Sequence, residues 1–308
     1  MKDSKQTTEH YFNKDLNLRK TWYSAAAEAY NKARPRYPKM LINRVVELAQ
    51  LPDDAIILEI GCGPGTATVT FAQLGFSMLC LEPNPDFCQI AQQNCAGYPT
   101  VEIQNTSFEE WEPRGKRFDA VLAATSIHWI PPEIAYPKAA DVLQDNGALI
   151  LLWNVPAIPQ YEVYQALQGV YRAYAPSLAQ YKGREAHEED LREIEQIVID
   201  SGRFKELVSG QVVWEVSYSI DEYLMLLSTF SQYLELEPQS RDALFEGLRQ
   251  KIEQTSAGSI QLSNLSAFDI ARKHGQGVGN IRVKTCTVIT SRGDEGIIPT
   301  MPSVTSTA

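Results

Sequence analysis

The sequence predicts an α/β fold organised around a mostly parallel sheet, and two observations support this prediction. Short apolar runs alternate with segments of helical periodicity through the first half of the chain, which is typical of parallel strands joined by crossover helices. Several runs are apolar almost without interruption, as expected for strands covered on both faces. The expected strands span residues 55–60, 77–82, 100–104, 118–124 and 147–153.

Helical segments flank this core on both sides. Residues 22–34 are predicted to form a helix that Pro35 ends, and Pro38 opens a second helix with apolar residues at helical spacing. Later helices are expected at 161–175, 188–201, 220–230 and 241–254, with strand patterns at 211–219 and 281–290. We therefore divide the chain into an N-terminal cap arm (1–39), a core (40–155) and a mainly helical insertion or lid (156–280). The insertion also supplies a strand near 205–219. A last core strand (281–291) and a tail (292–308) predicted to be disordered follow.

Charge is distributed unevenly along the 308 residues. The net charge is −10, which argues against the broad basic surface that nonspecific nucleic-acid binding needs. Residues 1–39 nevertheless carry nine Lys and Arg against four Asp and Glu, a local balance of +5. A basic arm docked on an acidic body is the preferred interpretation, and an anion-binding cap is the alternative.

The five cysteines form no Cys-x-x-Cys pair and have no regular spacing. We therefore expect neither a disulfide framework nor a metal site, and a reducing compartment fits this composition. The longest apolar run, residues 148–153, is too short to span a bilayer, and the N-terminal segment lacks the apolar stretch of a signal peptide. These features predict a cytoplasmic protein without membrane association.

The most informative motif is an apolar strand that runs directly into a glycine-rich turn, EIGCGPGT at residues 59–66. Glycine tolerates positive φ and has no side chain, so such a turn lets a nucleotide-type ligand approach the backbone. A dinucleotide fingerprint would have a third small residue where Thr66 stands, and Pro64 removes a backbone donor that a phosphate cradle would use. The turn therefore indicates a nucleotide-type cofactor but weakens the case for a dinucleotide.

Two further strand ends fit a nucleoside ligand. Glu82 follows an apolar run and lies 21 residues after Gly61, a spacing suited to an acid that accepts hydrogen bonds from both ribose hydroxyls. After the next strand, the polar segment 105–111 could contact an adenine edge while Phe108 supplies apolar surface. Ser107 and Glu110 also form a capping-box pattern, and both roles can hold together.

A fourth strand end places two small residues, Ala123 and Ala124, before Thr125. Small residues there would let a ligand lie across the edge of the sheet. His128 and Trp129 follow, and the histidine is a candidate proton acceptor near neutral pH. Packing or orientation is the alternative role for a histidine beside a tryptophan.

Together these strand ends resemble the class I S-adenosylmethionine-dependent methyltransferases. The resemblance rests on EIGCGPGT at 59–66, the acid at 82–83, FDAV at 118–121 and LQDNGAL at 143–149. The segments AYNKARPRYP at 29–38 and HWI at 128–130 are similar to the small-molecule subgroup that includes trans-aconitate methyltransferases. The resemblance implies a Rossmann-like three-layer sandwich whose mostly parallel, seven-stranded sheet is closed by an antiparallel strand pair. We expect the strand patterns at 211–219 and 281–290 to supply that pair.

The resemblance also implies S-adenosylmethionine as cofactor, with roles for individual residues. Glu59 would lie near the methionine amino group, Glu82 on the ribose, and Ser107 at the adenine, where the family often has an aspartate that this chain lacks. The full set of expected cofactor residues is Glu59, Gly61, Cys62, Gly63, Gly65, Glu82, Pro83, Ser107, Phe108, Ala124 and Thr125.

The expected reaction is methyl transfer to a small-molecule carboxylate, hydroxyl or amine by in-line displacement, which needs alignment of the reactants more than a covalent nucleophile. His128 is the candidate base for acceptors that must lose a proton, and a carboxylate-binding role for Arg34 or Arg36 follows from the charge of the arm. The expected acceptor residues are Tyr30, Arg34, Tyr37, His128 and Trp129. Two alternatives stay open: a nicotinamide-dependent oxidoreductase, and a non-catalytic regulatory protein that binds S-adenosylmethionine. The sequence leaves the acceptor and the oligomeric state undetermined.

Overall fold

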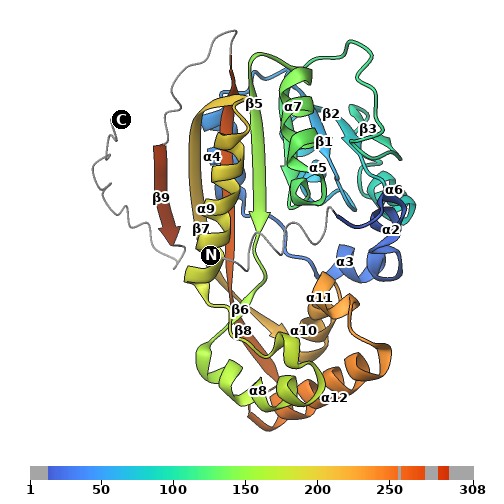
Figure 1. Ribbon diagram of the computed structural model, residues 1–308, viewed down its shortest axis with the longest axis vertical. Coiled ribbons are helices and arrows are strands. Elements are labelled where there is room, and N and C mark those ends of the chain that lie inside the picture. The colour runs from blue at the N-terminus through green and yellow to red at the C-terminus, as the bar shows by residue number, and fades with distance from the viewer. Residues whose placement is uncertain (1–12, 256–257, 275–283, 291–308) are drawn as a thin grey trace.

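A computed structural model describes residues 13–255, 258–274 and 284–290. The strands in these residues form a single mixed sheet in the order β3-β2-β1-β4-β5-β8-β7-β9, with the short strand β6 paired to β8 (Figure 1). Their bounds are β1 Ile56–Ile60, β2 Ser77–Leu81, β3 Val101–Gln104, β4 Phe118–Ala124, β5 Leu143–Asn154, β6 Ile158–Pro159, β7 Phe204–Ser219, β8 Ser259–Lys273 and β9 Lys284–Thr290.

Strands β1 to β5 pair in parallel, as the sequence predicts. The chain moves outward from β1 through β2 to β3 and then returns to the other side of β1 as β4. In open parallel sheets ligands bind where the strand order reverses in this way, at the carboxyl ends of the strands. The carboxyl ends of β1 and β4 therefore mark the expected position of a site.

Helices cover both faces of this sheet and complete three layers. They are α4 Lys39–Ala49, α5 Thr68–Gln73, α6 Pro85–Asn94, α7 Pro132–Val142 and α9 Arg184–Asp200. One face is packed by α4 and α5 through residues such as Leu41 and Phe71, and the other by α7 and α9 through residues such as Ala139 and Val198. The predicted Rossmann-like α/β sandwich is confirmed, with nine strands in the described residues instead of the seven expected.

The antiparallel part of the sheet differs from the expectation. The strand antiparallel to β5 is β8, which the sequence did not predict, and β8 also pairs antiparallel with β7. Polar residues interrupt the apolar pattern of β8, yet Asn264, Ser266 and Asp269 are all buried. The predicted strand at 281–290 corresponds to β9, which pairs parallel to β7; residues 281–283 lie outside the described residues, as does the tail predicted to be disordered.

The long strands β7 and β8 extend beyond the core and carry a helical lid, which Figure 1 shows below the sheet. The lid helices are α8 Tyr161–Tyr174, α10 Ile220–Leu227, α11 Ser231–Leu234 and α12 Pro238–Thr255. They pack around a separate apolar cluster that includes Leu167, Leu244 and Leu248. The lid therefore has its own small core and meets the sheet through β7 and β8.

The N-terminal arm contains helices α2 Leu16–Thr21 and α3 Ala27–Ala33, joined by the turn Ser24–Ala26. Asp15 caps α2 by accepting hydrogen bonds from the amides of Asn17 and Leu18. In Figure 1 the arm lies beside the carboxyl ends of β1 and β2 and close to the lid. Within the described residues, no helix combines the length and the apolar character needed to cross a bilayer.

Candidate cofactor and active site

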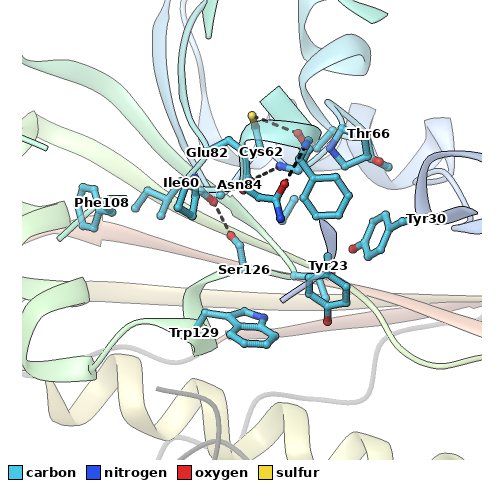
Figure 2. Close-up of a pocket in the computed structure, with 18 of the residues that line it drawn as sticks. Tyr23, Tyr30, Ile60, Cys62, Thr66, Glu82, Asn84, Phe108, Ser126 and Trp129 are labelled. Atoms are coloured by element: carbon cyan, nitrogen blue, oxygen red, sulfur yellow. Dashed lines mark hydrogen bonds between the residues drawn. The ribbon is translucent and has the colours of Figure 1, made fainter. Parts of the chain in front are cut away.

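A cavity lies at the carboxyl ends of β1, β2 and β4, under the N-terminal arm. We call it the core pocket. Its wall combines backbone of the glycine turn with aromatic side chains of the arm. Figure 2 shows Tyr23, Tyr30 and Trp129 on one side of it and Glu82 and Asn84 on the other. The predicted site residues that line it are Tyr30, Arg34, Tyr37, Gly61, Cys62, Gly63, Glu82, Pro83, Ser107, Phe108, Ala124, Thr125 and Trp129.

The glycine turn is held against two neighbouring strand ends. The amides of Gly61 and Cys62 both donate to the carbonyl of Leu81, at 2.8 and 3.1 Å. Gly61 has a φ of 65°, and a Cβ built on it would lie 2.8 Å from Cβ of Ser126, so both conformation and space require glycine there. Gly63 has a φ of 57° but open space around it. The turn thus presents bare backbone to the core pocket.

Glu59 is fully buried beneath this turn and does not line the core pocket. Its Oε2 accepts a hydrogen bond from the Thr68 hydroxyl at 2.6 Å, while its Oε1 has no partner among the described residues. Burial raises the pKa of Glu59 to about 8, so its carboxyl is mostly protonated at neutral pH. Glu59 therefore joins β1 to α5 from below, and Gly65 likewise lies outside the set of lining residues.

Glu82 does face the core pocket. Its Oε2 accepts from the amide of Gly63 at 2.7 Å and its Oε1 from the amide of Asn84 at 2.8 Å, which joins the glycine turn to the end of β2. Burial raises the pKa of Glu82 to about 7, and these two hydrogen bonds oppose the shift. Each carboxylate oxygen retains capacity for a further hydrogen bond. The group is thus fixed in place and still able to accept hydrogen bonds from a ligand.

The segment after β3 makes part of the predicted capping box, and its contact with an adenine stays a prediction. The Glu110 amide donates to Ser107 Oγ at 3.3 Å, Ser107 Oγ donates to Glu110 Oε2 at 2.9 Å, and both Ser107 and Phe108 line the core pocket. Lys138 of α7 holds this segment from behind: its Nζ donates to the carbonyls of Phe108 at 2.6 Å and Glu109 at 3.1 Å, and to that of Trp111. Lys138 orders the turn, a role that its sequence position on a distant helix does not reveal.

The end of β4 supplies the remaining wall of the core pocket. Thr125 adopts a φ of 54°, and its Oγ1 is hydrogen-bonded to the Tyr37 hydroxyl at 2.9 Å. Burial raises the pKa of Tyr37 well above its usual value. Strain in a non-glycine residue at such a φ persists only where surrounding contacts fix it. Tyr37 of the arm is one of those contacts, so the arm and the β4 end form one unit.

His128 does not reach the core pocket. Its side chain lines a separate small cavity with Tyr136 and Trp153, on the α7 and α9 face of the sheet. Burial lowers the pKa of His128 to about 4, so the imidazole is neutral at physiological pH. The short helix Ile127–Trp129 turns Trp129 into the core pocket and His128 away from it. The geometry therefore gives no support to the predicted role of His128 as a base, and favours the alternative of a packing residue.

The arm closes the core pocket with ion pairs. Arg19 pairs with Glu109 at 2.8 Å and also donates to the carbonyl of Trp129, while Lys20 pairs with Glu110 at 2.8 Å. These contacts agree with the preferred interpretation of a basic arm docked on an acidic body. For Arg19 and Lys20, the positive charge of the arm was the one feature of the sequence that indicated such contacts.

Both arginines proposed to bind an acceptor carboxylate have partners within the chain. Arg34 donates to Thr229 Oγ1 at 2.8 Å and to its carbonyl at 2.7 Å, and its guanidinium lies 4.0 Å from the ring centre of Phe230. Arg36 donates to Thr66 Oγ1 at 3.1 Å and to the carbonyl of Asn31 at 3.2 Å. Arg34 thus joins the arm to the lid, and Arg36 joins it to the glycine turn.

Sequence reasoning missed about half of the pocket lining. Asn84 could have been found, because an Asn-Pro step just after Glu82 is a typical helix cap, and its side chain does cap α6. Most others come from the arm or from loops whose proximity is tertiary. The additional lining residues are Leu16, Arg19, Lys20, Tyr23, Pro35, Ile60, Pro64, Thr66, Ala67, Asn84, Phe87, Glu109, Ser126, Ile130 and Asn154.

Comparison with known proteins agrees with this architecture. Residues 57–147 match the family model described as a methyltransferase domain. This part of the chain is similar to a methyltransferase domain. The fold is shared with a solved structure named as a putative type II methyltransferase from Anaeromyxobacter dehalogenans, which superposes with a TM-score of 0.54 at 20% identity, covering 78% of this chain and 97% of that one.

Curated relatives match part of the chain. An uncharacterized methyltransferase of Mycobacterium tuberculosis is 32% identical over 133 residues, covering 43% of this chain and 51% of the relative. A ubiquinone biosynthesis O-methyltransferase of Azorhizobium caulinodans is 32% identical over 98 residues, covering 31% of this chain and 38% of the relative. The match thus spans about half the length of the mycobacterial relative.

Proposed function

We propose that the protein transfers a methyl group from S-adenosylmethionine to a small-molecule acceptor. The observation that carries this proposal is Glu82, whose carboxylate is bonded to the amide of Gly63 inside the core pocket. The Glu82 carboxylate can accept hydrogen bonds from two hydroxyl groups, and it lies beside a turn of exposed glycine backbone. A ribose bound against such a turn requires this arrangement. The methyltransferase domain at residues 57–147 supports the same assignment.

The residues present fit this cofactor. Glu82 would hold the ribose hydroxyls, and Ser107 with the Phe108 backbone would contact the adenine. The remaining contacts would come from the glycine turn, from Pro83 and from the end of β4 at Ala124 and Thr125. Glu59 and Gly65 would support the turn from beneath. The Oε1 of Glu59, which has no partner among the described residues, lies beneath the turn and outside the core-pocket lining.

S-adenosylmethionine supplies a sulfonium methyl group, which the acceptor nucleophile displaces in line while the electron pair of the broken bond passes to sulfur. The chain contributes alignment, which can be worth roughly 7–11 kcal/mol. The arm contributes water exclusion, since Arg19 and Lys20 hold it across the opening. A hydroxyl acceptor would release its proton to water, because His128 points away from the core pocket.

The acceptor is a small molecule in this proposal. One segment of the arm is similar to the trans-aconitate methyltransferase subgroup. It contributes Tyr30, Arg34 and Tyr37 to the lining of the core pocket. Carboxylate, hydroxyl and amine acceptors are all compatible with in-line displacement. The Azorhizobium relative, named as an O-methyltransferase, favours a hydroxyl among these.

Calorimetric titration with S-adenosylhomocysteine tests the cofactor assignment. Glu82→Gln should weaken binding by about 100-fold, because the amide replaces charge-assisted hydrogen bonds and its NH₂ group opposes a backbone amide. Glu102→Gln on the exposed face of β3 is the matched control and should bind as the unchanged protein does.

Two outcomes would contradict the proposal. The first is equal binding in both variants. The second is NAD that co-purifies with the protein and is displaced by added NADH, which would restore the oxidoreductase alternative. A screen of labelled S-adenosylmethionine with small acids, phenols and amines separates an enzyme from a regulatory protein, which would bind the cofactor and methylate none of them.

A further inference from the structure

A second large cavity lies within the lid, separate from the core pocket. It has a volume of about 620 Å³ between α8, the start of α9 and the α10–α11 segment, and it shares no lining residue with the core pocket. We call it the lid cavity. Most of its wall is apolar or aromatic, including Leu167, Leu227 and Phe230. Such a cavity suits a ligand with an apolar or aromatic body.

Three tyrosine hydroxyls meet at one wall of the lid cavity. Tyr171 and Tyr233 are hydrogen-bonded at 2.8 Å, and Tyr223 interacts with Tyr171 beside them. All three side chains are more than nine-tenths buried, with exposures of 6%, 6% and 3% in the order Tyr171, Tyr233, Tyr223. We call this group the tyrosine trio.

The tyrosine trio has more O–H donors than it uses internally. Three hydroxyls carry three protons, and the hydrogen bond between Tyr171 and Tyr233 consumes one of them. Among the described residues, no carbonyl or carboxylate accepts a hydrogen bond from Tyr223. Leaving a buried donor unsatisfied costs about 1–3 kcal/mol. The lid cavity therefore offers a hydrogen-bond donor to an oxygen atom on a ligand.

The charges around the lid cavity disfavour an anion. Its lining contains one cation, Lys182, against the three carboxylates of Glu189, Asp190 and Glu193. Lys182 is itself bound to Asp190 at 2.6 Å. Arg34 and Arg36, the arginines predicted to bind an acceptor carboxylate, are bonded to Thr229 and Thr66. A neutral ligand fits these surroundings better than a polycarboxylate.

Two side chains in contact separate the cavities at one point. Phe230 lines the lid cavity, and the Arg34 guanidinium, which lines the core pocket, lies 4.0 Å from the centre of its ring. Next to it, Ser231 Oγ is hydrogen-bonded to the Tyr23 hydroxyl at 2.6 Å. A ligand of the lid cavity therefore reaches the core pocket only when the Phe230 and Arg34 side chains move.

We propose that the lid cavity binds the methyl acceptor, and that the acceptor is a neutral aromatic compound with an oxygen that accepts a hydrogen bond from the tyrosine trio. A second hydroxyl, directed at Phe230, is the group methylated: its oxygen bonds to the methyl carbon as the carbon–sulfur bond breaks toward sulfur, and its proton goes to water. The assignment rests on the proposed function for its reaction, but binding to the lid cavity can be measured without the cofactor.

The test compares two probes that share a ring and differ in charge, methyl 4-hydroxybenzoate and 4-hydroxybenzoate, by calorimetry on the full chain. We expect the ester to bind at least tenfold more tightly than the anion, and Tyr223→Phe to weaken ester binding about five- to tenfold by removing one hydroxyl. Tyr174→Phe, the same change on the exposed face of α8, is the control and should have no effect. Leu227→Trp, which fills the lid cavity, should abolish ester binding.

S-adenosylhomocysteine affinity should stay unchanged in all three variants, which separates this proposal from that of the cofactor. The assignment would be overturned if neither Tyr223→Phe nor Leu227→Trp weakened ester binding. Tighter binding of the anion, or an ester that does not bind at all, would also overturn it. If the unchanged protein binds the ester but does not bind S-adenosylhomocysteine, the proposed function is overturned and the lid cavity remains a binding site.

Discussion

The core pocket and the lid cavity are built from different kinds of groups, and we expect them to recognise ligands by different means. In the core pocket the decisive groups are backbone amides and one carboxylate fixed by them, as in the contact of Glu82 with Gly63. In the lid cavity they are side-chain hydroxyls from separate helices, Tyr171 on α8 and Tyr233 on α11. Backbone groups in a turn are placed by local conformation, whereas side chains on different helices are placed only by packing. The difference implies that changes in the lid can alter the acceptor without disturbing the methyl donor.

The largest effect should come from Gly61, where backbone geometry is most restricted. Gly61→Ala places a methyl group 2.8 Å from Ser126 at a φ of 65°, so we expect a loss of about 2–4 kcal/mol in the free energy of unfolding and no measurable cofactor binding. Gly63→Ala, at a similar φ with open space, should cost only about 1 kcal/mol in denaturant titration. Equal losses would mean that strain alone, and not contact with Ser126, determines the requirement for glycine.

The pH dependence of stability should reveal the buried carboxyl beneath the core pocket. The pKa of Glu59 is raised by burial to about 8, so the folded state binds a proton that the unfolded chain releases near pH 4.5. Its contribution to stability is complete below pH 4.5 and is lost as pH rises toward 8, with a slope of up to about 1.4 kcal/mol per pH unit. Glu59→Gln should reduce this slope in denaturant titrations between pH 5 and 8, leaving the part that Glu82, with its pKa raised to about 7, contributes. A slope unchanged in the variant would assign the pH dependence to other groups.

A substitution of Lys138 should weaken the binding of S-adenosylhomocysteine and leave ester binding in the lid cavity unchanged. Lys138→Met keeps the apolar stem but removes the hydrogen bonds to the carbonyls of Phe108 and Glu109, so the adenine segment should loosen. We expect S-adenosylhomocysteine affinity to fall about five- to tenfold, as loss of one or two hydrogen bonds predicts. Lys116→Met at an exposed turn is the control. An equal fall in ester affinity would show that the two sites are not independent.

The ion pairs of the arm should give the smallest effect. The Arg19–Glu109 pair is largely buried, whereas Lys20–Glu110 is more exposed, so Arg19→Ala should speed S-adenosylhomocysteine release several-fold and Lys20→Ala less than twofold. Stopped-flow release measured at low and high salt provides the test, because screening should reduce only the contribution of the exposed pair. If Arg19→Ala and Lys20→Ala change the release rate equally, the Arg19 ion pair does not hold the arm over the methyl donor.

The part of the site that could be predicted from sequence is the part built by consecutive residues. The turn at Gly61 and Gly63 follows from glycine conformation, and the position of Glu82 follows from the length of one strand–helix–strand unit. By contrast, His128 and Trp129 are adjacent in sequence but face different cavities, since a single turn of 3₁₀ helix divides them. No periodicity shows which neighbour faces the ligand in so short an element.

The sequence by itself determined the parallel core, the glycine turn and the acid beside it, because apolar periodicity and backbone preference act over a few residues. Only the tertiary structure decided that the polar strand β8 is buried between β5 and β7, that Lys138 supports the segment after β3, and that three tyrosines meet in the lid. Those features depend on long-range pairing and on which faces pack together. The methyl-donor site is therefore encoded locally, and the lid cavity exists only once the helices have assembled.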